Sequence, residues 1–194
     1  MTSGELKRAK REVRRRVLAA RDAIDPADRA RAAVAVADRV LALPEIVGAT
    51  TVLAFSSFGS ELSTLPLIDA LVGRGVVVGL PVIVDGNLEG RSWRPGEPTS
   101  ETWFGAQEPV GGDVIDPSAI DVIVTPAVAV DPAGRRVGYG GGFYDRFLPR
   151  TRADAFRVAV VLPEQLVREE LPAGAFDLRV HAIVTPDEVI RCAP

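Results

Sequence analysis

Residues 51–84, TVLAFSSFGSELSTLPLIDALVGRGVVVGLPVIV, contain the pattern that decides the fold. The stretch begins with a short run of β-forming residues at 51–55 and ends with a second apolar run at 76–84. Between them, Thr64 before a Leu-Pro pair is a typical helix start, and glycines end the helix near residues 73–75. A strand, a helix and a strand at this spacing predict a right-handed unit with two parallel strands.

The same pattern continues on both sides of this stretch. Upstream, Asp25 provides a capping acid before Pro26, which predicts a helix over residues 26–42. Alternating strands and helices predict one α/β domain over residues 1–194, with three layers and a mainly parallel sheet. The further strands are expected at DVIVT (121–125), FRVAVVL (156–162) and VHAIVT (180–185).

One segment departs from this pattern. Residues 85–120 are richer in Gly, Pro and polar residues than their neighbours. Short strands are expected near residues 88–93, and Glu108-Pro109 is expected to form a turn. The segment is therefore predicted to be an irregular insertion over the edge of the sheet.

The N-terminal segment, residues 5–24, is predicted to be an amphipathic helix with a basic surface. Lys10, Arg14 and Arg21 fall along one border of its apolar stripe, and the other arginines point into solvent. Residues 1–21 carry eight Lys or Arg and two Glu, whereas the whole chain has a net charge of −3, so the body is acidic. The stripe consists of Leu6, Val13, Val17, Ala20 and Ile24.

The composition excludes several classes of protein. Of the 194 residues, 47% are hydrophobic and 25% charged, which is typical of a soluble globular chain. A single Cys (Cys192) and a single His (His181) exclude an internal disulfide and a His-rich zinc site. No apolar run reaches the roughly 18 residues that span a membrane. We therefore expect a cytoplasmic protein without membrane contact, and the acidic body argues against a nucleic-acid partner.

A glycine-rich segment, residues 138–142, follows a buried strand and precedes a run with helical character. Consecutive glycines let backbone N–H groups converge on an anion, and the helix N-terminus adds its dipole. Phosphate is the natural ligand for such a loop. The segment lacks the last glycine of a dinucleotide fingerprint and the lysine of a Walker loop. A tight turn that needs glycine only for its backbone freedom is the alternative.

Charged residues near this segment favour the phosphate interpretation. Arg136 precedes the glycines, and Asp145 lies in the first turn after them. A carboxylate beside a phosphate suggests Mg²⁺ between the two, although an acid that serves only the helix dipole is the alternative. Lys10 is one of only two lysines among 23 basic residues, and its compact ammonium group suits a phosphate oxygen. A snorkelling side chain is the alternative for Lys10.

The sequence resembles the 5-formyltetrahydrofolate cyclo-ligases, also called methenyltetrahydrofolate synthetases. The resemblance is strongest in DVIVTPAVAVDPAGRRVGYGGGFYDRFL (121–148), where a G-x-G-G-G-[YF]-Y-D-R string follows an arginine and is highly specific. It covers most of the chain. Its other parts are the K-x-x-x-R pair Lys10 and Arg14, Ser56, the ELST segment from Glu61, Glu108-Pro109, Gln165, Leu171-Pro172, Asp177 and the final VHAIVTP.

The resemblance implies an α/β fold related to the sugar-phosphate isomerase and CoA-transferase group. It also implies an ATP- and Mg²⁺-dependent cyclisation of 5-formyltetrahydrofolate to 5,10-methenyltetrahydrofolate, with release of ADP and phosphate. A formamide oxygen is a poor leaving group, so ATP is needed to convert it into a phosphate ester before an amine closes the ring. The implied partners are these small molecules alone, and we expect a monomer.

The site residues that the resemblance implies fall into three groups. Lys10, Arg136 and Tyr144 are the implied catalytic residues, and Asp145 and Asp177 lie on the Mg²⁺ side. The ATP contacts are Lys10, Arg14, Arg136, Val137, Gly138, Tyr139, Gly140, Gly141, Gly142, Phe143 and Tyr144. The folate contacts are Ser56, Glu61, Tyr139, Gly140, Gly141, Gly142 and Phe143, and the aromatic candidates for its walls are Phe55, Phe58, Trp93 and Trp103.

Three positions depart from the family pattern. Phe143 stands where many members have Tyr, Phe176 precedes Asp177 where His is frequent, and Val130 precedes an aspartate where Phe is usual. The alternatives are a phosphosugar isomerase or CoA-transferase that needs no ATP, a non-catalytic folate- or nucleotide-binding module, and a nucleic-acid module that uses the basic helix.

Overall fold

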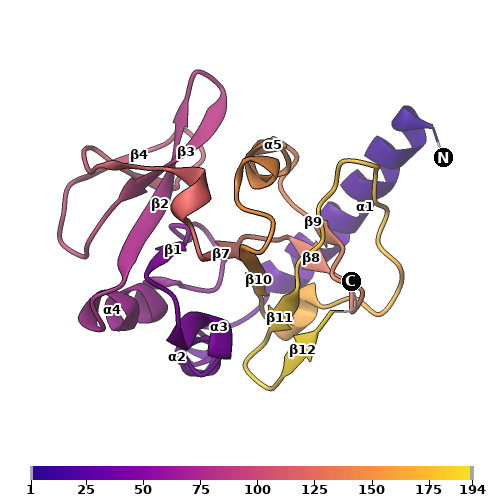
Figure 1. Ribbon diagram of the computed structural model, residues 1–194. Helices are drawn as coiled ribbons and strands as arrows, with labels where there is room; N and C mark the ends of the chain where they lie inside the picture. The colour runs from indigo at the N-terminus through magenta and orange to yellow at the C-terminus, as the bar shows by residue number, and fades with distance from the viewer. Residues whose placement is uncertain (1, 193–194) are drawn as a thin grey trace.

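The computed structural model describes residues 2–192, which form an eight-stranded sheet with helices on both faces (Figure 1). Five central strands are parallel, and antiparallel strands extend the sheet at both edges. The predicted three-layer α/β fold with a mainly parallel sheet is confirmed. In spatial order the strands are β12 (Val189–Arg191), β11 (Ala182–Val184), β10 (Phe156–Val160), β7 (Val122–Thr125), β1 (Thr51–Leu53), β2 (Val77–Val84), β3 (Asn87–Ser92) and β6 (Val114–Ile115).

The predicted strand–helix–strand unit lies at the centre of the sheet. Strands β1 and β2 pair in parallel with Thr51 opposite Val77, and α4 (Leu65–Gly73) connects them. Strand β7 pairs with the other side of β1, and all four of its residues are buried. Strands covered on both faces are expected to be continuously apolar, which explains why these runs were recognisable in the sequence.

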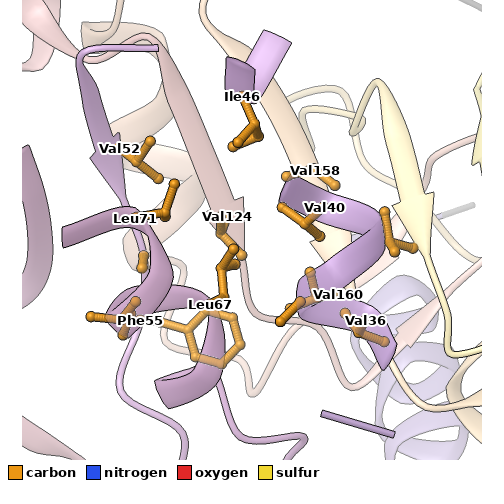
Figure 2. Close-up of a cluster of buried hydrophobic side chains, with 14 of the residues drawn as sticks. Val36, Val40, Ile46, Val52, Phe55, Leu67, Leu71, Val124, Val158 and Val160 are labelled. Atoms are coloured by element: carbon orange, nitrogen blue, oxygen red, sulfur yellow. The ribbon is translucent and has the colours of Figure 1, made fainter. Parts of the chain in front are cut away.

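One face of the sheet is covered by α2 (Pro26–Leu41), α3 (Pro44–Val47) and α4 (Figure 1). Helix α2 begins as predicted, with the Asp25 side chain accepting a hydrogen bond from the Ala27 N–H at 2.7 Å. Figure 2 shows the resulting core, in which apolar side chains of the helices interdigitate with those of β1, β7 and β10. The labelled side chains are Val36, Val40, Ile46, Val52, Phe55, Leu67, Leu71, Val124, Val158 and Val160.

The opposite face carries α5 (Phe143–Phe147) and the 3-10 turn η2 (Leu148–Arg150), with Phe147 packed against the sheet. Helix α1 (Ser3–Asp22) does not lie on the sheet itself. It packs against the small hairpin of β8 (Ala129–Val130) and β9 (Arg136–Val137) and against the turn η3 (Pro163–Gln165). Val17 is buried in this contact, but Ala20 is exposed, so its predicted place in the apolar stripe is wrong.

The region predicted as an irregular insertion is more regular than expected. Residues 87–92 form β3, which pairs with β2 over its whole length, and a separate hairpin joins β4 (Thr99–Glu101) to β5 (Gln107–Pro109). The expected Glu108-Pro109 turn is wrong, because both residues belong to β5. The short strands expected near residues 88–93 are confirmed as β3. The β4–β5 hairpin and the short strand β12 were not predicted, because partly solvated edge strands are polar and carry no continuous apolar run. The turn η1 (Pro117–Ala119) leads back into β7.

Across residues 2–192, no helix has the length and apolar composition needed to cross a membrane. The longest helix, α1, has 20 residues, and its surface carries the exposed arginines that the sequence predicted.

A buried aspartate fixes the hairpin that leads into the glycine-rich segment. Asp131 is 1% exposed, and its Oδ1 accepts the N–H groups of Ala133 and Arg135 at 3.0 Å each. Its Oδ2 accepts the Leu171 N–H at 2.9 Å and the Arg135 guanidinium at 3.2 Å. The carboxylate therefore joins the β8–β9 turn to the segment after η3 and sets the position of Arg136.

We expect Asp131→Asn to lower the free energy of unfolding by about 3 kcal/mol, because an amide NH₂ group would face N–H donors in a buried site. Urea denaturation measures this difference. Asp154→Asn is the matched control, because Asp154 is 78% exposed and pairs with Arg152 at the surface; we expect a change within about 0.5 kcal/mol. Equal stabilities of the two variants would contradict this account of Asp131.

Candidate active site

A cleft of about 930 Å³ opens beyond the carboxyl ends of β1 and β7, the place where open α/β sheets bind ligands. Four parts of the chain line it: the basic side of α1, the loop after β1, the glycine-rich segment 138–142, and the β4–β5 hairpin. Most of the residues expected for the site lie here. They are Lys10, Arg14, Ser56, Glu61, Arg136, Gly138, Tyr139, Gly140, Gly141, Gly142, Phe143, Tyr144 and Asp145.

Two of the residues expected to bind ATP or Mg²⁺ do not line this cleft. Val137 is 1% exposed and packs in the hydrophobic cluster under α1, so its side chain supports the loop. Asp177 is bound to Lys10 on the side of α1. The sequence grouped Asp177 with Asp145, but the structure gives the two carboxylates different basic partners.

The glycine-rich segment needs its glycines for steric reasons. Gly140 has φ 108° and Gly142 has φ 67°, a region that other residues rarely adopt. At Gly141 an added Cβ would lie 2.6 Å from the ring of Phe143. Gly142 is the N-terminal cap of α5, so the segment ends with free N–H groups beside the cleft.

Arg136 and Tyr144 carry polar atoms that no group in residues 2–192 satisfies. The Arg136 side chain is 5% exposed, and its Nη2 donates to Asp145 Oδ1 at 2.7 Å. Its Nε and the Tyr144 hydroxyl are both buried without a hydrogen-bond partner. Burial raises the pKa of Tyr144 well above its ordinary value, so the hydroxyl is a neutral donor. Unpartnered buried donors beside a cleft are candidates for hydrogen bonds to a ligand or a bound water.

Helix α1 brings two further cations to the cleft. Arg14 donates from Nε to the Gly138 carbonyl at 2.6 Å and so attaches the helix to the glycine-rich segment. Lys10 forms an ion pair with Asp177 Oδ2, which also accepts the Gly174 N–H at 2.7 Å. Asp177 thus holds the ammonium group of Lys10 at the border of the cleft.

The acidic residues were tested for their fit to a metal ion. Among the described residues, no group of three or more His, Cys, Asp or Glu side chains gathers at one point. Mg²⁺ needs no such group, because it is usually held by one or two carboxylates together with substrate phosphates. Asp145 fits this description: it lines the cleft, one oxygen binds Arg136, and its side chain is 33% exposed.

The loop after β1 supplies the other side of the cleft. Glu61 Oε1 accepts the Tyr139 hydroxyl at 2.7 Å, and Oε2 accepts the Phe58 N–H at 3.0 Å. Burial raises the pKa of Glu61, and these two hydrogen bonds and the charge of Arg21 oppose that shift. A carboxylate fixed in this way can accept paired N–H groups from a heterocycle.

Aromatic rings form the wall beside this carboxylate. The Phe58 ring lies 5.0 Å from Tyr139 and 5.5 Å from Phe104, and Trp103 is 95% exposed at the tip of the β4–β5 hairpin. Phe58 and Trp103 line the cleft as the sequence suggested, but Trp93 does not. Phe104 was missed, because a lone aromatic residue in a polar loop carries no periodic signal.

Arg21 is the other functional candidate that the sequence did not single out for the site. It is 3% exposed and donates from Nη1 to the Tyr139 hydroxyl at 2.9 Å. The available signal was its helical spacing: Arg21 lies seven residues after Arg14, on the same border of the stripe as Lys10.

The fold is an α/β fold, and its cleft has cationic side chains and a glycine-rich segment on one side and a carboxylate with aromatic rings on the other. Residues 6–186 match the model of the 5-formyltetrahydrofolate cyclo-ligase family. The chain therefore belongs to this family of ligases.

Individual relatives agree with this assignment. The 5-formyltetrahydrofolate cyclo-ligase of Escherichia coli K12 is 37% identical over 158 residues, which cover 79% of this chain and 87% of the relative. The enzyme of that name from Mycolicibacterium smegmatis is 35% identical over 150 residues, covering 72% and 75%. The NMR structure of Aquifex aeolicus 5,10-methenyltetrahydrofolate synthetase superposes with a TM-score of 0.83 at 30% identity, covering 95% of this chain and 93% of that one.

The raised pKa of Glu61 predicts a pH-dependent effect of Glu61→Gln on stability. The folded state favours the protonated carboxyl group, so the wild-type protein loses stability as the pH rises from the ordinary range of Glu through the raised value. Gln carries no charge and avoids this loss. The stability of the variant relative to wild type should therefore increase as the pH rises above the ordinary range of Glu, measured by urea denaturation at a series of pH values. Glu164→Gln, at an exposed position, should show no such trend.

Proposed function

We propose that this protein catalyses the ATP-dependent cyclisation of 5-formyltetrahydrofolate to 5,10-methenyltetrahydrofolate, with release of ADP and phosphate. Membership of the cyclo-ligase family supports the reaction over a phosphosugar isomerase, a CoA-transferase or a non-catalytic module. The observation that carries the proposal is the pair of unsatisfied donors, Arg136 Nε and the Tyr144 hydroxyl, between the glycine-rich segment and the Glu61 pocket.

The reaction has two steps. The formyl oxygen attacks the γ-phosphorus of ATP, and the bond to ADP breaks, which leaves a phosphate ester on the formyl carbon. The neighbouring amine nitrogen of the folate then attacks that carbon and loses its proton to solvent, and phosphate departs with the C–O bond electrons as the ring closes. Phosphoryl transfer requires from the protein mainly positioning and stabilisation of charge, so no conventional nucleophile is needed.

The anion side of the cleft provides that stabilisation. Arg136 and the N–H groups of the glycine-rich segment are fixed before any ligand arrives, so they need no reorganisation during the transfer. Lys10 adds a point charge, and Arg14 holds the glycine-rich segment in place through the Gly138 carbonyl. The neutral Tyr144 hydroxyl donates to the group that crosses between ATP and folate.

Mg²⁺ belongs to this proposal as the partner of Asp145, whose carboxylate lines the cleft. When bound, the ion neutralises charge on the ATP phosphates. Asp177 is the second proposed acid; in the structure it holds Lys10 in position, and a metal role would require that ion pair to open.

The folate side is formed by Ser56, Glu61 and residues 139–143. Glu61 would accept the amino and ring N–H groups of the pterin, and the rings of Phe58 and Tyr139 would pack against its face. We further propose a cytoplasmic monomer that acts on small molecules, not on nucleic acid or membranes; the Cys-poor composition and the acidic body of the chain support this.

The direct test is to mix the purified protein with 5-formyltetrahydrofolate and Mg-ATP and to follow the absorbance of methenyltetrahydrofolate. We expect product only when ATP and Mg²⁺ are both present, together with one phosphate per product. An unchanged rate without ATP would refute the proposal.

Asp145→Asn tests the metal ligand. The amide keeps the size but loses the charge, so the Mg²⁺ concentration for half-maximal rate should rise about tenfold, and the rate at saturating ATP should fall. A Mg²⁺ titration of the initial rate measures both effects. Asp154→Asn, at an exposed position outside the cleft, is the control. Superimposable titrations for Asp145→Asn and wild type would exclude a metal role.

A further inference from the structure

Arg21 is a buried exception on a helix whose other arginines face solvent or the cleft. It is 3% exposed, whereas Arg15 and Arg16, on the same helix, are largely exposed. Its guanidinium donates from Nε to Ser60 Oγ at 2.9 Å and from Nη1 to the Tyr139 hydroxyl at 2.9 Å. One buried cation thus joins α1 to both loops that form the heterocycle pocket.

The chemistry of these groups fixes the direction of every hydrogen bond. A guanidinium has only donors and does not lose its proton, so the Tyr139 oxygen must accept from Arg21. The single proton of the Tyr139 hydroxyl is then available for Glu61 Oε1, 2.7 Å away. In the same way Ser60 accepts from Arg21 and donates to Asp22. The hydrogen bonds therefore run in one direction only, from Arg21 through Tyr139 to the Glu61 carboxylate.

This series of hydrogen bonds leaves one edge of the Glu61 carboxylate free to accept further hydrogen bonds. Oε1 is engaged by Tyr139 and Oε2 by the Phe58 N–H, one donor for each oxygen. Each carboxylate oxygen can accept a further hydrogen bond, and Glu61 lines the cleft. The Tyr139 ring packs against Phe58 with ring centroids 5.0 Å apart, so the two groups that hold Glu61 also contact each other.

We propose that Arg21 is a positioning residue for the substrate: it acts through Tyr139 to hold the Glu61 carboxylate so that its free edge accepts two parallel N–H groups of a planar heterocycle. The inference rests on the proposed function, because the heterocycle is the folate pterin. Arg21 touches neither the substrate nor the reacting atoms. The charged groups on the ATP side are Lys10, Arg14 and Arg136, none of which Arg21 contacts, so a loss of Arg21 should change folate binding and leave nucleotide binding nearly intact.

The first test compares Arg21→Met with Arg15→Met, which removes the same charge from an exposed position of the same helix. Affinities for 5-formyltetrahydrofolate without ATP, and for Mg-ATP without folate, are measured by titration calorimetry. We expect Arg21→Met to weaken folate binding about tenfold or more, the usual effect of losing a charge-assisted hydrogen bond, with Mg-ATP affinity within about twofold. Arg15→Met should change neither. Unchanged folate affinity in a folded Arg21→Met protein, or equal losses of both affinities, would overturn the proposal.

A second measurement needs no ligand. The carbon-13 signal of the Glu61 carboxyl group, assigned with Glu61→Gln, is followed during a pH titration. The ionisable groups that face Glu61 are Arg21 from α1, Tyr139 from the glycine-rich segment and Tyr144 from α5. Arg21→Met should raise the pKa of Glu61, because the nearest positive charge is lost. If the pKa of Glu61 is the same in Arg21→Met and wild type, the proposed series of hydrogen bonds is contradicted. This outcome is decisive even if the protein binds no folate.

Arg21→Lys tests the geometry of the guanidinium separately from its charge. It is also the test variant to use if Arg21→Met does not fold. Lys keeps the positive charge but lacks the planar pair of donors that reaches Ser60 and Tyr139 together. We expect the Glu61 titration to stay close to wild type and the KM for folate to rise with little change in kcat. Wild-type KM in Arg21→Lys would overturn the geometric part of the proposal. Failure of the wild-type protein to bind folate would instead refute the proposed function, while the carboxyl titration would still decide the role of Arg21.

Discussion

The site depends on keeping arginine side chains buried beside a water-filled cleft. A guanidinium removed from water is costly unless acceptors surround it, and each buried arginine here is held by a few specific partners. Arg136 is held by Asp145, and the position of Arg136 is set in turn by the β8–β9 hairpin that Asp131 anchors. If one of these contacts were lost, the glycine-rich segment would lose the support that fixes its N–H groups at the edge of the cleft.

Helix α1 connects the two sides of this arrangement. Its side chains at positions 10, 14 and 21 lie on one border, because intervals of four and seven residues return to the same side of an α-helix. Lys10 and Arg14 serve the anion side, and Arg21 serves the heterocycle pocket. A single rigid element therefore sets the distance between the two sides of the cleft, where the proposed function places ATP and folate. Such positioning is the main requirement of phosphoryl transfer.

Several groups in the cleft are arranged for ligands at the expense of stability. The Tyr144 hydroxyl and Arg136 Nε are buried without partners among the described residues, and burial raises the pKa of Glu61 and so disfavours its charged form. Each of these features costs free energy in the unliganded protein. A ligand that completes the hydrogen bonds recovers that energy as affinity. The large apolar core between the sheet and α2 and α4 allows the fold to tolerate this cost (Figure 2).

The sequence by itself determined the central β1–α4–β2 unit and the strands β7, β10 and β11, because strands covered on both faces must be continuously apolar. It also determined the glycine-rich segment with Arg136 and Asp145, because these residues are adjacent in the chain. Strand β3 was expected near residues 88–93 and is confirmed, whereas β4, β5 and β12 escaped prediction, since short, polar and partly exposed strands resemble loops.

Only the tertiary structure decided which distant side chains meet. It paired Lys10 with Asp177 and joined Arg21 to Tyr139 and Glu61, across separations that no local pattern encodes. Periodicity reports the face of a helix on which a residue lies, but the partner across that face depends on how the whole chain packs.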